Sequence, residues 1–237
     1  MNSEHSTAKK INVSSTLTES WQLVSGLKLP VFLIDVIAPF CFVIVFFFIG
    51  YTLLSTFLPD VIAGPIFLIV SFLFMWLTVV VYTMLGVRRA LGLPATIMAS
   101  VNQCGQTFIK VMLLSLGWLI VMAAFFALGE HNVHKNDDAL VFVAFLIVYI
   151  MSAPFFIFTV PLVVHNRFSI LQALKQSYVM MFRNFIPIAA CYILMLMILF
   201  ISMIPFGIGL IWTQPMFTAL GGVLFRDLFA VSLKQEK

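Results

Sequence analysis

The chain has 237 residues, of which 62% are hydrophobic and 9% are charged, and its mean hydropathy is +1.13. A soluble domain carries roughly a quarter charged residues, so this composition excludes a water-soluble globular protein. The net charge of +4 follows a pattern that is typical of membrane topology, and no nucleic-acid partner is expected.

The apolar residues form long uninterrupted blocks instead of the alternation that a membrane β-barrel requires. Each block is near the roughly 20 residues that a membrane-spanning helix needs. The blocks predict an all-α protein with six transmembrane helices over residues 31–57, 62–86, 109–128, 139–163, 185–206 and 208–230. We expect these helices to pair as three hairpins within a single transmembrane domain, residues 14–231.

The residues on either side of this domain are mostly polar. Residues 1–13, which include Lys9 and Lys10, are predicted to be a disordered cytoplasmic N-terminus, and residues 232–237 a cytoplasmic tail. The first apolar block lacks the short apolar region and small-residue cleavage site of a secretory signal. We therefore expect no removed signal peptide.

The basic residues indicate how the helices are oriented. With these six spans, Lys135 falls on one side of the membrane and the other twelve Lys and Arg residues fall on the opposite side. Cytoplasmic loops are enriched in Lys and Arg, so the basic side and both termini are predicted to be cytoplasmic. Six cations are expected at the membrane interface: Lys28, Arg88, Arg89, Lys110, Arg183 and Arg226.

Three cytoplasmic segments share a pattern that predicts a threefold internal repeat. Ser14 to Lys28, Thr96 to Lys110 and Ser169 to Arg183 align without gaps, and each begins with a hydroxyl residue and ends with a cation. Their apolar residues follow helical spacing. Each segment is therefore predicted to be an amphipathic helix that precedes a hairpin, in repeat units of about 14–87, 96–164 and 169–231.

The ends of these segments carry helix-capping signals. A Ser or Thr side chain accepts a hydrogen bond from a first-turn amide, and the pairs Thr16 with Glu19 and Ser169 with Gln172 have the spacing of a capping box. A cation at the far end suits the helix dipole. The alternative remains that each segment is only the cytoplasmic extension of the next span.

Asp35 is the clearest ionisable residue at membrane depth, where such residues are costly and often functional. It is a candidate to bind a cation or relay a proton. The alternative is that Asp35 lies close to the interface and pairs with Lys28, Arg88 or Arg226.

The last predicted span contains Gln214, Pro215 and Thr218. Broken helices with polar residues line the substrate site of some transporters, so Gln214 and Thr218 join Asp35 as a candidate intramembrane polar site. More often such residues serve helix packing, and the small residues from Ala219 to Gly222 could pack either within the bundle or between subunits.

Other constellations are weaker. His131, His134 and Asp137 have ligand types suited to a divalent metal, but they lie in one loop with no second ligand segment, so a solvated turn is preferred. The three cysteines, Cys41, Cys104 and Cys191, are single and predicted to be buried packing residues. Because no nucleophile with a nearby base and no phosphate-binding loop is found, we expect no enzyme, cofactor or metal.

The second half of the chain resembles an uncharacterised family of proteobacterial six-span inner-membrane proteins, known only as a domain of unknown function. The residues that carry this resemblance are Pro154–Phe156, Val160–Val163, Ser169, Gln172–Ser177, Arg183–Pro187, Gly207–Gly209, Pro215 and Arg226–Phe229. The general shape is also similar to the membrane domain of bacterial glycerophosphodiester phosphodiesterases, although this chain has no soluble segment large enough for the phosphodiesterase domain. The resemblance implies a multi-pass protein of the bacterial inner membrane and assigns no site residues.

Two main functional hypotheses follow from these observations. The first is a non-enzymatic membrane component that supports envelope or lipid homeostasis, with membrane lipids, another copy of itself or another membrane protein as partners. The second is a transporter or channel for a small solute or lipid that uses Asp35 and Gln214. A membrane-embedded enzyme is the third. A water-filled cavity near mid-membrane that contains both residues would favour transport, and a closed apolar interior would favour the first hypothesis.

Overall fold

The computed structural model describes residues 11–117, 120, 155–165, 168–204 and 207–233. Within these ranges the regular secondary structure is helical and contains no strand, in agreement with the predicted all-α class. Much of the predicted third and fourth spans falls outside the described residues. The arrangement of six spans in three hairpins is therefore not defined by the described part of the chain.

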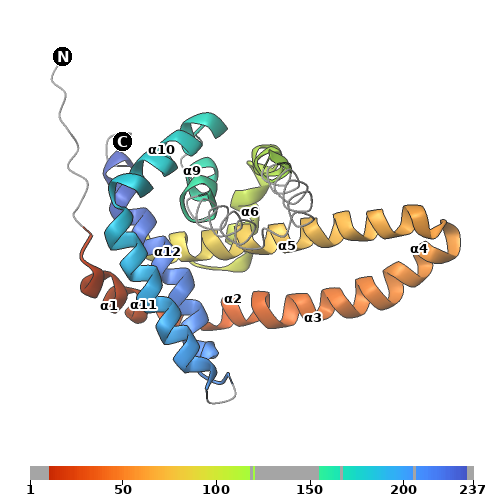
Figure 1. The fold of residues 1–237 in the computed structure, drawn as a ribbon, viewed down its shortest axis with the longest axis horizontal. Helices are drawn as coiled ribbons and strands as arrows, with labels where there is room; N and C mark the ends of the chain where they lie inside the picture. Colours follow the sequence, from red (N-terminus) through yellow and green to blue (C-terminus); the bar gives the residue numbers. More distant parts are fainter. Residues whose placement is uncertain (1–10, 118–119, 121–154, 166–167, 205–206, 234–237) are drawn as a thin grey trace, which may run out of the picture.

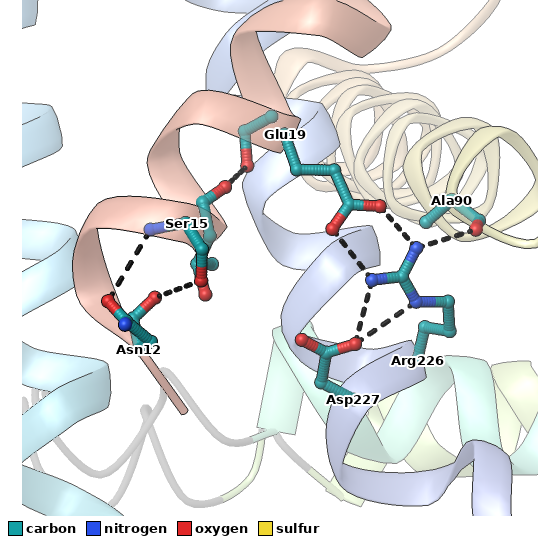
Figure 2. Close-up of polar contacts among 8 residues, drawn as sticks. Asn12, Ser15, Glu19, Ala90, Arg226 and Asp227 are labelled. Atoms are coloured by element: carbon teal, nitrogen blue, oxygen red, sulfur yellow. Dashed lines mark hydrogen bonds and ion pairs between the residues drawn. The ribbon is translucent and has the colours of Figure 1, made fainter. Parts of the chain in front are cut away.

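The first helix begins earlier than predicted. Helix α1 (Val13–Leu23) starts after Asn12, whose side chain accepts hydrogen bonds from the backbone amides of Ser14 and Ser15 at 3.2 and 3.5 Å. Figure 2 shows Asn12 beside Ser15. The predicted capping box of Thr16 and Glu19 is therefore wrong. Thr16 is already inside the helix, because a carboxamide makes as good a cap as a hydroxyl and lies one turn upstream.

A helical path without a loop runs from Lys28 to Phe57, close to the predicted first span. It consists of α2 (Lys28–Phe32), η2 (Leu33–Ile37), α3 (Ala38–Phe42), η3 (Val43–Tyr51) and α4 (Thr52–Phe57), where η2 and η3 have π-helical hydrogen bonding. Helix α5 (Asp60–Ala90) then returns beside it, and the two form a long hairpin (Figure 1). The Phe42 and Phe74 rings stack across this hairpin with centroids 4.0 Å apart.

The other two predicted amphipathic segments form helices with the predicted caps. The Thr96 side chain accepts from the amide of Ala99 at the start of α6 (Ile97–Gly105), and the Ser169 side chain accepts from the amide of Gln172 at the start of α10 (Ile170–Arg183). The short elements η4 (Phe155–Thr159) and α9 (Val160–Val164) precede α10. The buried Thr159 hydroxyl donates to the Ser177 hydroxyl at 2.8 Å and joins η4 to α10.

Each amphipathic helix ends before the apolar helix that follows it. A 3₁₀ turn, η1 (Val24–Gly26), separates α1 from α2, a turn at Gln106 and Thr107 follows α6, and Asn184 separates α10 from α11. The predicted terminal cation therefore occurs only in α10, whose last turn contains Arg183. Lys28 and Lys110 instead lie in the following helices, because both amphipathic helices end earlier than predicted.

Helices α11 (Phe185–Met203) and α12 (Leu210–Leu233) form a second hairpin. Gly207 adopts a φ of +75° in the connection, which a residue with a side chain rarely does. A Cβ at Gly209 would lie 2.8 Å from the Ser202 carbonyl oxygen, so glycine permits the tight return. Pro215 lies inside α12 and does not interrupt it, so the helix break considered for this span is absent.

Helices α5 and α12 cross at two glycines, and this crossing connects the two hairpins. A Cβ on Gly222 would lie 2.1 Å from the Gly86 carbonyl oxygen, and a Cβ on Gly86 would lie 2.1 Å from the Thr218 carbonyl oxygen. The two backbones are thus in direct contact. Figure 1 shows the hairpins diverging from this region. The patch from Ala219 to Gly222 therefore packs within the molecule, where Ala219 and Gly222 are buried.

Among the described residues, three helical stretches are long and apolar enough to cross a membrane: Lys28–Phe46, Ile62–Ala90 and Phe185–Met203. Their outer surfaces carry large exposed apolar side chains, such as Phe40, Ile69 and Phe200. A soluble protein rarely exposes so much contiguous apolar surface. These features are those of a membrane protein, in which lipid covers these faces.

Candidate functional site

A cavity of about 350 Å³ lies where the two hairpins approach each other. Asp35 of η2, Gln214 and Thr218 of α12 all line it, so the fold brings the three residues of the predicted intramembrane site together. Tyr82 of α5 and Tyr192 of α11 line the same cavity. With Ile157 of η4, five helical segments from separate parts of the sequence contribute to one pocket.

Tyr82 and Gln214 connect the two walls of this pocket. The Tyr82 hydroxyl donates to the Gln214 backbone carbonyl at 2.9 Å and lies 3.2 Å from Gln214 Oε1, across 132 residues of sequence. Gln214 therefore serves as the interhelical hydrogen-bond partner that membrane interiors favour, and it also lines the pocket. Sequence reasoning missed Tyr82, although Thr78, Tyr82 and Thr83 form a polar group on an otherwise apolar span.

The threonine hydroxyl groups of the pocket are directed to nearby backbone carbonyls. Thr78 donates to Phe74, Thr83 donates to Val79, and Thr218 donates to Gln214, at 2.8 to 3.1 Å. Each of these threonines satisfies its donor within its own helix, as threonine does in apolar surroundings. The remaining wall is mostly apolar and includes Phe217 and Ile157.

Asp35 forms no ion pair within the described part of the chain. The alternative in which Asp35 is neutralised by Lys28, Arg88 or Arg226 is therefore wrong for this structure. Each of these three cations instead contacts an acceptor or an aromatic ring on another segment. The Asp35 side chain is left at the pocket as its only carboxylate among the described lining residues.

Lys28 and Arg88 hold other helices together. The Lys28 ammonium lies 5.1 Å from the centre of the Trp212 ring, within range of a cation–π interaction between α2 and α12. Arg88 donates to the Pro94 carbonyl and to Gln103 Oε1 at 2.9 Å each. Gln103 Nε2 in turn lies 3.0 Å from His165 Nδ1, so this chain of contacts connects α5, α6 and the end of α9.

The protonation of His165 fits this network. Burial lowers the pKa of the His165 imidazole from its usual value, and the nearby Arg88 charge lowers this pKa further. The ring is therefore neutral near pH 7, and its Nδ1 accepts a hydrogen bond from the Gln103 amide. His165 thus contacts a specific residue of another segment.

Arg226 lies at the centre of a second polar cluster (Figure 2). Its guanidinium donates to both carboxylate oxygens of Glu19 at 2.5 and 2.8 Å, and also to Asp227 at 2.7 and 3.1 Å. The Ala90 carbonyl accepts a further hydrogen bond at 3.4 Å. Arg226 thus fastens α1 and the end of α5 to α12. Arg89 adds a contact from its Nε to the Leu23 carbonyl at 3.3 Å.

The other predicted site residues do not join the pocket. Lys110 and Arg183 are exposed, and His131, His134 and Asp137 lie outside the described residues. Within the described ranges no group of three metal-ligating side chains occurs. Cys104 and Cys191 are buried as predicted, but Cys41 is exposed on the apolar surface, because a thiol is apolar enough to face lipid.

Comparisons with known proteins give no match to a family model, a curated protein or a solved structure. The resemblance to the six-span inner-membrane family therefore stays a prediction.

Proposed function

We propose that this chain is a six-span protein of the bacterial inner membrane that transports a small solute by way of the pocket at Asp35 and Gln214. In this proposal both termini are cytoplasmic, the chain consists of three repeat units, and its surroundings are membrane lipids. The three amphipathic helices α1, α6 and α10 lie on the cytoplasmic side.

One observation carries the proposal: the three polar residues predicted for an intramembrane site converge on one cavity. Its volume lies at the lower end of the range for small-molecule sites, about 300–1,000 Å³. A carboxylate without an ion pair in the described structure is costly near lipid, and ligand binding or proton transfer is the usual reason for retaining one. A residue needed only for packing would not have to be charged.

The contacts at the pocket favour a non-enzymatic role. Acid–base catalysis most often uses histidine or a pair of carboxylates, and the described wall offers one carboxylate and no histidine, while the Tyr82 hydroxyl donates to Gln214. Burial raises the pKa of the Cys104 thiol to about 11, so this cysteine stays protonated and is a poor nucleophile near pH 7.

The proposal is tested by cysteine labelling with a water-borne maleimide in a chain whose three native cysteines are replaced. Single cysteines are placed at 35, 192 and 214 in the pocket. The matched control is I193C, because Ile193 is adjacent to Tyr192 and 58% exposed on the apolar surface of α11. Maleimide reacts with the ionised thiol, which forms only where water reaches it.

We expect labelling at 35, 192 and 214 and at least about tenfold slower labelling at 193, because lipid excludes water from the outer face of a span. A known pocket ligand is not needed for this experiment. Equal and slow reaction at all four positions would contradict an aqueous pocket and would leave transport without support.

A second function is favoured by the tight crossing of α5 and α12 and by the ring contacts along the first hairpin. In this alternative the chain is a structural component of the envelope or of lipid homeostasis, and it assembles with itself or with another membrane protein. Slow maleimide labelling at all four cysteine positions would favour this alternative, because the polar residues of the pocket would then serve helix packing alone.

A further inference from the structure

The pocket combines a single described carboxylate with a mostly apolar wall. From this combination we infer that the site takes an organic monocation with an apolar body, such as a protonated aralkyl amine, and that Asp35 pairs with its cationic group. This inference rests on the pocket of the proposed function and adds the class of ligand.

The aromatic side chains of the wall suit such a ligand. Tyr192 and Phe217 meet edge to face with centroids 5.6 Å apart, and Tyr82 lies on the wall formed by α5. Aromatic faces attract organic cations and also cover an apolar body. An anionic ligand would instead meet the Asp35 carboxylate, with no cation among the described lining residues to offset the repulsion.

A bare divalent metal ion fits the pocket less well. Such an ion requires about six oxygen ligands arranged around it. The threonine hydroxyls of the wall point to carbonyls of their own helices, and the Tyr82 hydroxyl points to Gln214. Asp35 remains as the one strong oxygen ligand in the described wall. One carboxylate is enough for an ammonium group, because that ligand brings its own hydrogen-bond donors.

The pocket has room for an apolar body next to Gly221. A Cβ at this position would lie 3.8 Å from the Tyr192 hydroxyl oxygen and 4.0 Å from Ile157 Cγ2, which are ordinary contact distances. A small substitution at Gly221 therefore leaves the helices in place, whereas a large one extends into the pocket. This position allows the pocket to be filled without changing a charged residue.

The inference is tested with three probes of similar size and different charge: 2-phenylethylammonium, 2-phenylethanol and 3-phenylpropionate. Their binding to the full chain in phosphatidylcholine nanodiscs is measured by isothermal titration calorimetry at pH 7. Empty nanodiscs give the background from partition into lipid. We expect the cation to bind at least about tenfold more tightly than the alcohol, and the anion to bind most weakly.

Variants then assign the effect to the pocket. D35N is expected to reduce the preference for the cation over the alcohol to within about twofold. G221L is expected to weaken both probes, and G221A, its matched control, to bind as the unchanged chain does. The comparison of the three probes on the unchanged chain does not depend on whether D35N folds.

Three results would overturn the inference. They are equal binding of the cation and the alcohol, a preference for the cation that D35N retains, and no binding of any probe. If positions 192 and 214 still react with the water-borne maleimide in these cases, the pocket and the proposed function stand, and only the ligand class is wrong. If positions 192 and 214 do not react with the maleimide, the proposed function fails as well.

Discussion

Adjacent glycines in α12 have different roles. Gly222 meets the backbone of α5 at Gly86, whereas Gly221 faces the pocket and has space for a methyl group. Small residues allow helices in membranes to approach until their backbones touch, and this contact replaces the hydrophobic driving force that lipid does not supply. The sequence placed both glycines in a single small-residue patch, and only the structure separates them.

The first prediction compares these two glycines. G222A is expected to lower the free energy of unfolding by about 1–3 kcal/mol or more. Its Cβ would clash with the backbone of α5, which cannot move aside by changing a rotamer as a side chain can. G221A is expected to be neutral or to raise it by up to about 1 kcal/mol, because alanine favours the helix. Denaturant titration in mild detergent micelles measures both. Equal losses in the two variants would contradict the close crossing.

Among the elements, α1 depends on a contact that is distant in the sequence. Arg226 and Glu19 form a bidentate pair across 207 residues, with side chains 23% and 35% exposed. Pairs on open surfaces contribute little, but two parallel charge-assisted hydrogen bonds in a partly buried setting contribute more. The pair therefore helps to hold the amphipathic helix against α12.

The second prediction is a double-mutant cycle on this pair. R226Q and E19Q are each expected to destabilise the fold, and the double variant to lose less than the sum, with a coupling of about 1–2 kcal/mol. The free energies are measured by denaturant titration in detergent micelles. R183Q with E19Q is the control cycle, because Arg183 is an exposed cation at the end of α10. A coupling near zero in both cycles would show that the pair does not dock α1.

The helix starts show which local signals are sufficient. Thr96 and Ser169 cap α6 and α10 as predicted, because each is the last polar residue before an apolar helical pattern. At α1 several polar residues compete, and Asn12 caps the helix upstream of Thr16. Glu19 therefore does not take part in a capping box. Its carboxylate accepts a hydrogen bond from Arg226 instead, a contact that no local sequence pattern indicates.

For the whole molecule, the two described hairpins meet at one end and diverge from it (Figure 1). The contacts that fix this arrangement are the Gly86 crossing, the Tyr82 bond to Gln214 and the Arg226 cluster. Away from them, large apolar side chains face outward. In a membrane these surfaces are in contact with lipid, which fits the three helices long enough to cross.

The last prediction concerns orientation. In intact cells, a membrane-impermeant maleimide is expected to label single cysteines at positions 60 and 137, and to label position 234 only after the membrane is permeabilised. The physical reason is the excess of Lys and Arg on one side of the predicted spans. Labelling of position 234 in intact cells, or no labelling of position 60, would overturn the proposed topology.

The sequence by itself determined the helical class, the membrane environment and the bounds of α5, α11 and α12 to within a few residues. Long apolar blocks dictate these features locally, since a backbone in lipid has to satisfy its own hydrogen bonds. It also singled out Asp35, Gln214 and Thr218, because polar residues are conspicuous in apolar helices.

Only the tertiary structure decided which of these residues meet. It placed the three in one pocket with Tyr82 and Tyr192, directed the neighbouring cations to other partners, and brought Gly86 against Gly222. These outcomes depend on how helices from distant parts of the chain cross. Residue spacing determines which side chains share one face of a helix. It does not determine which other helix that face contacts.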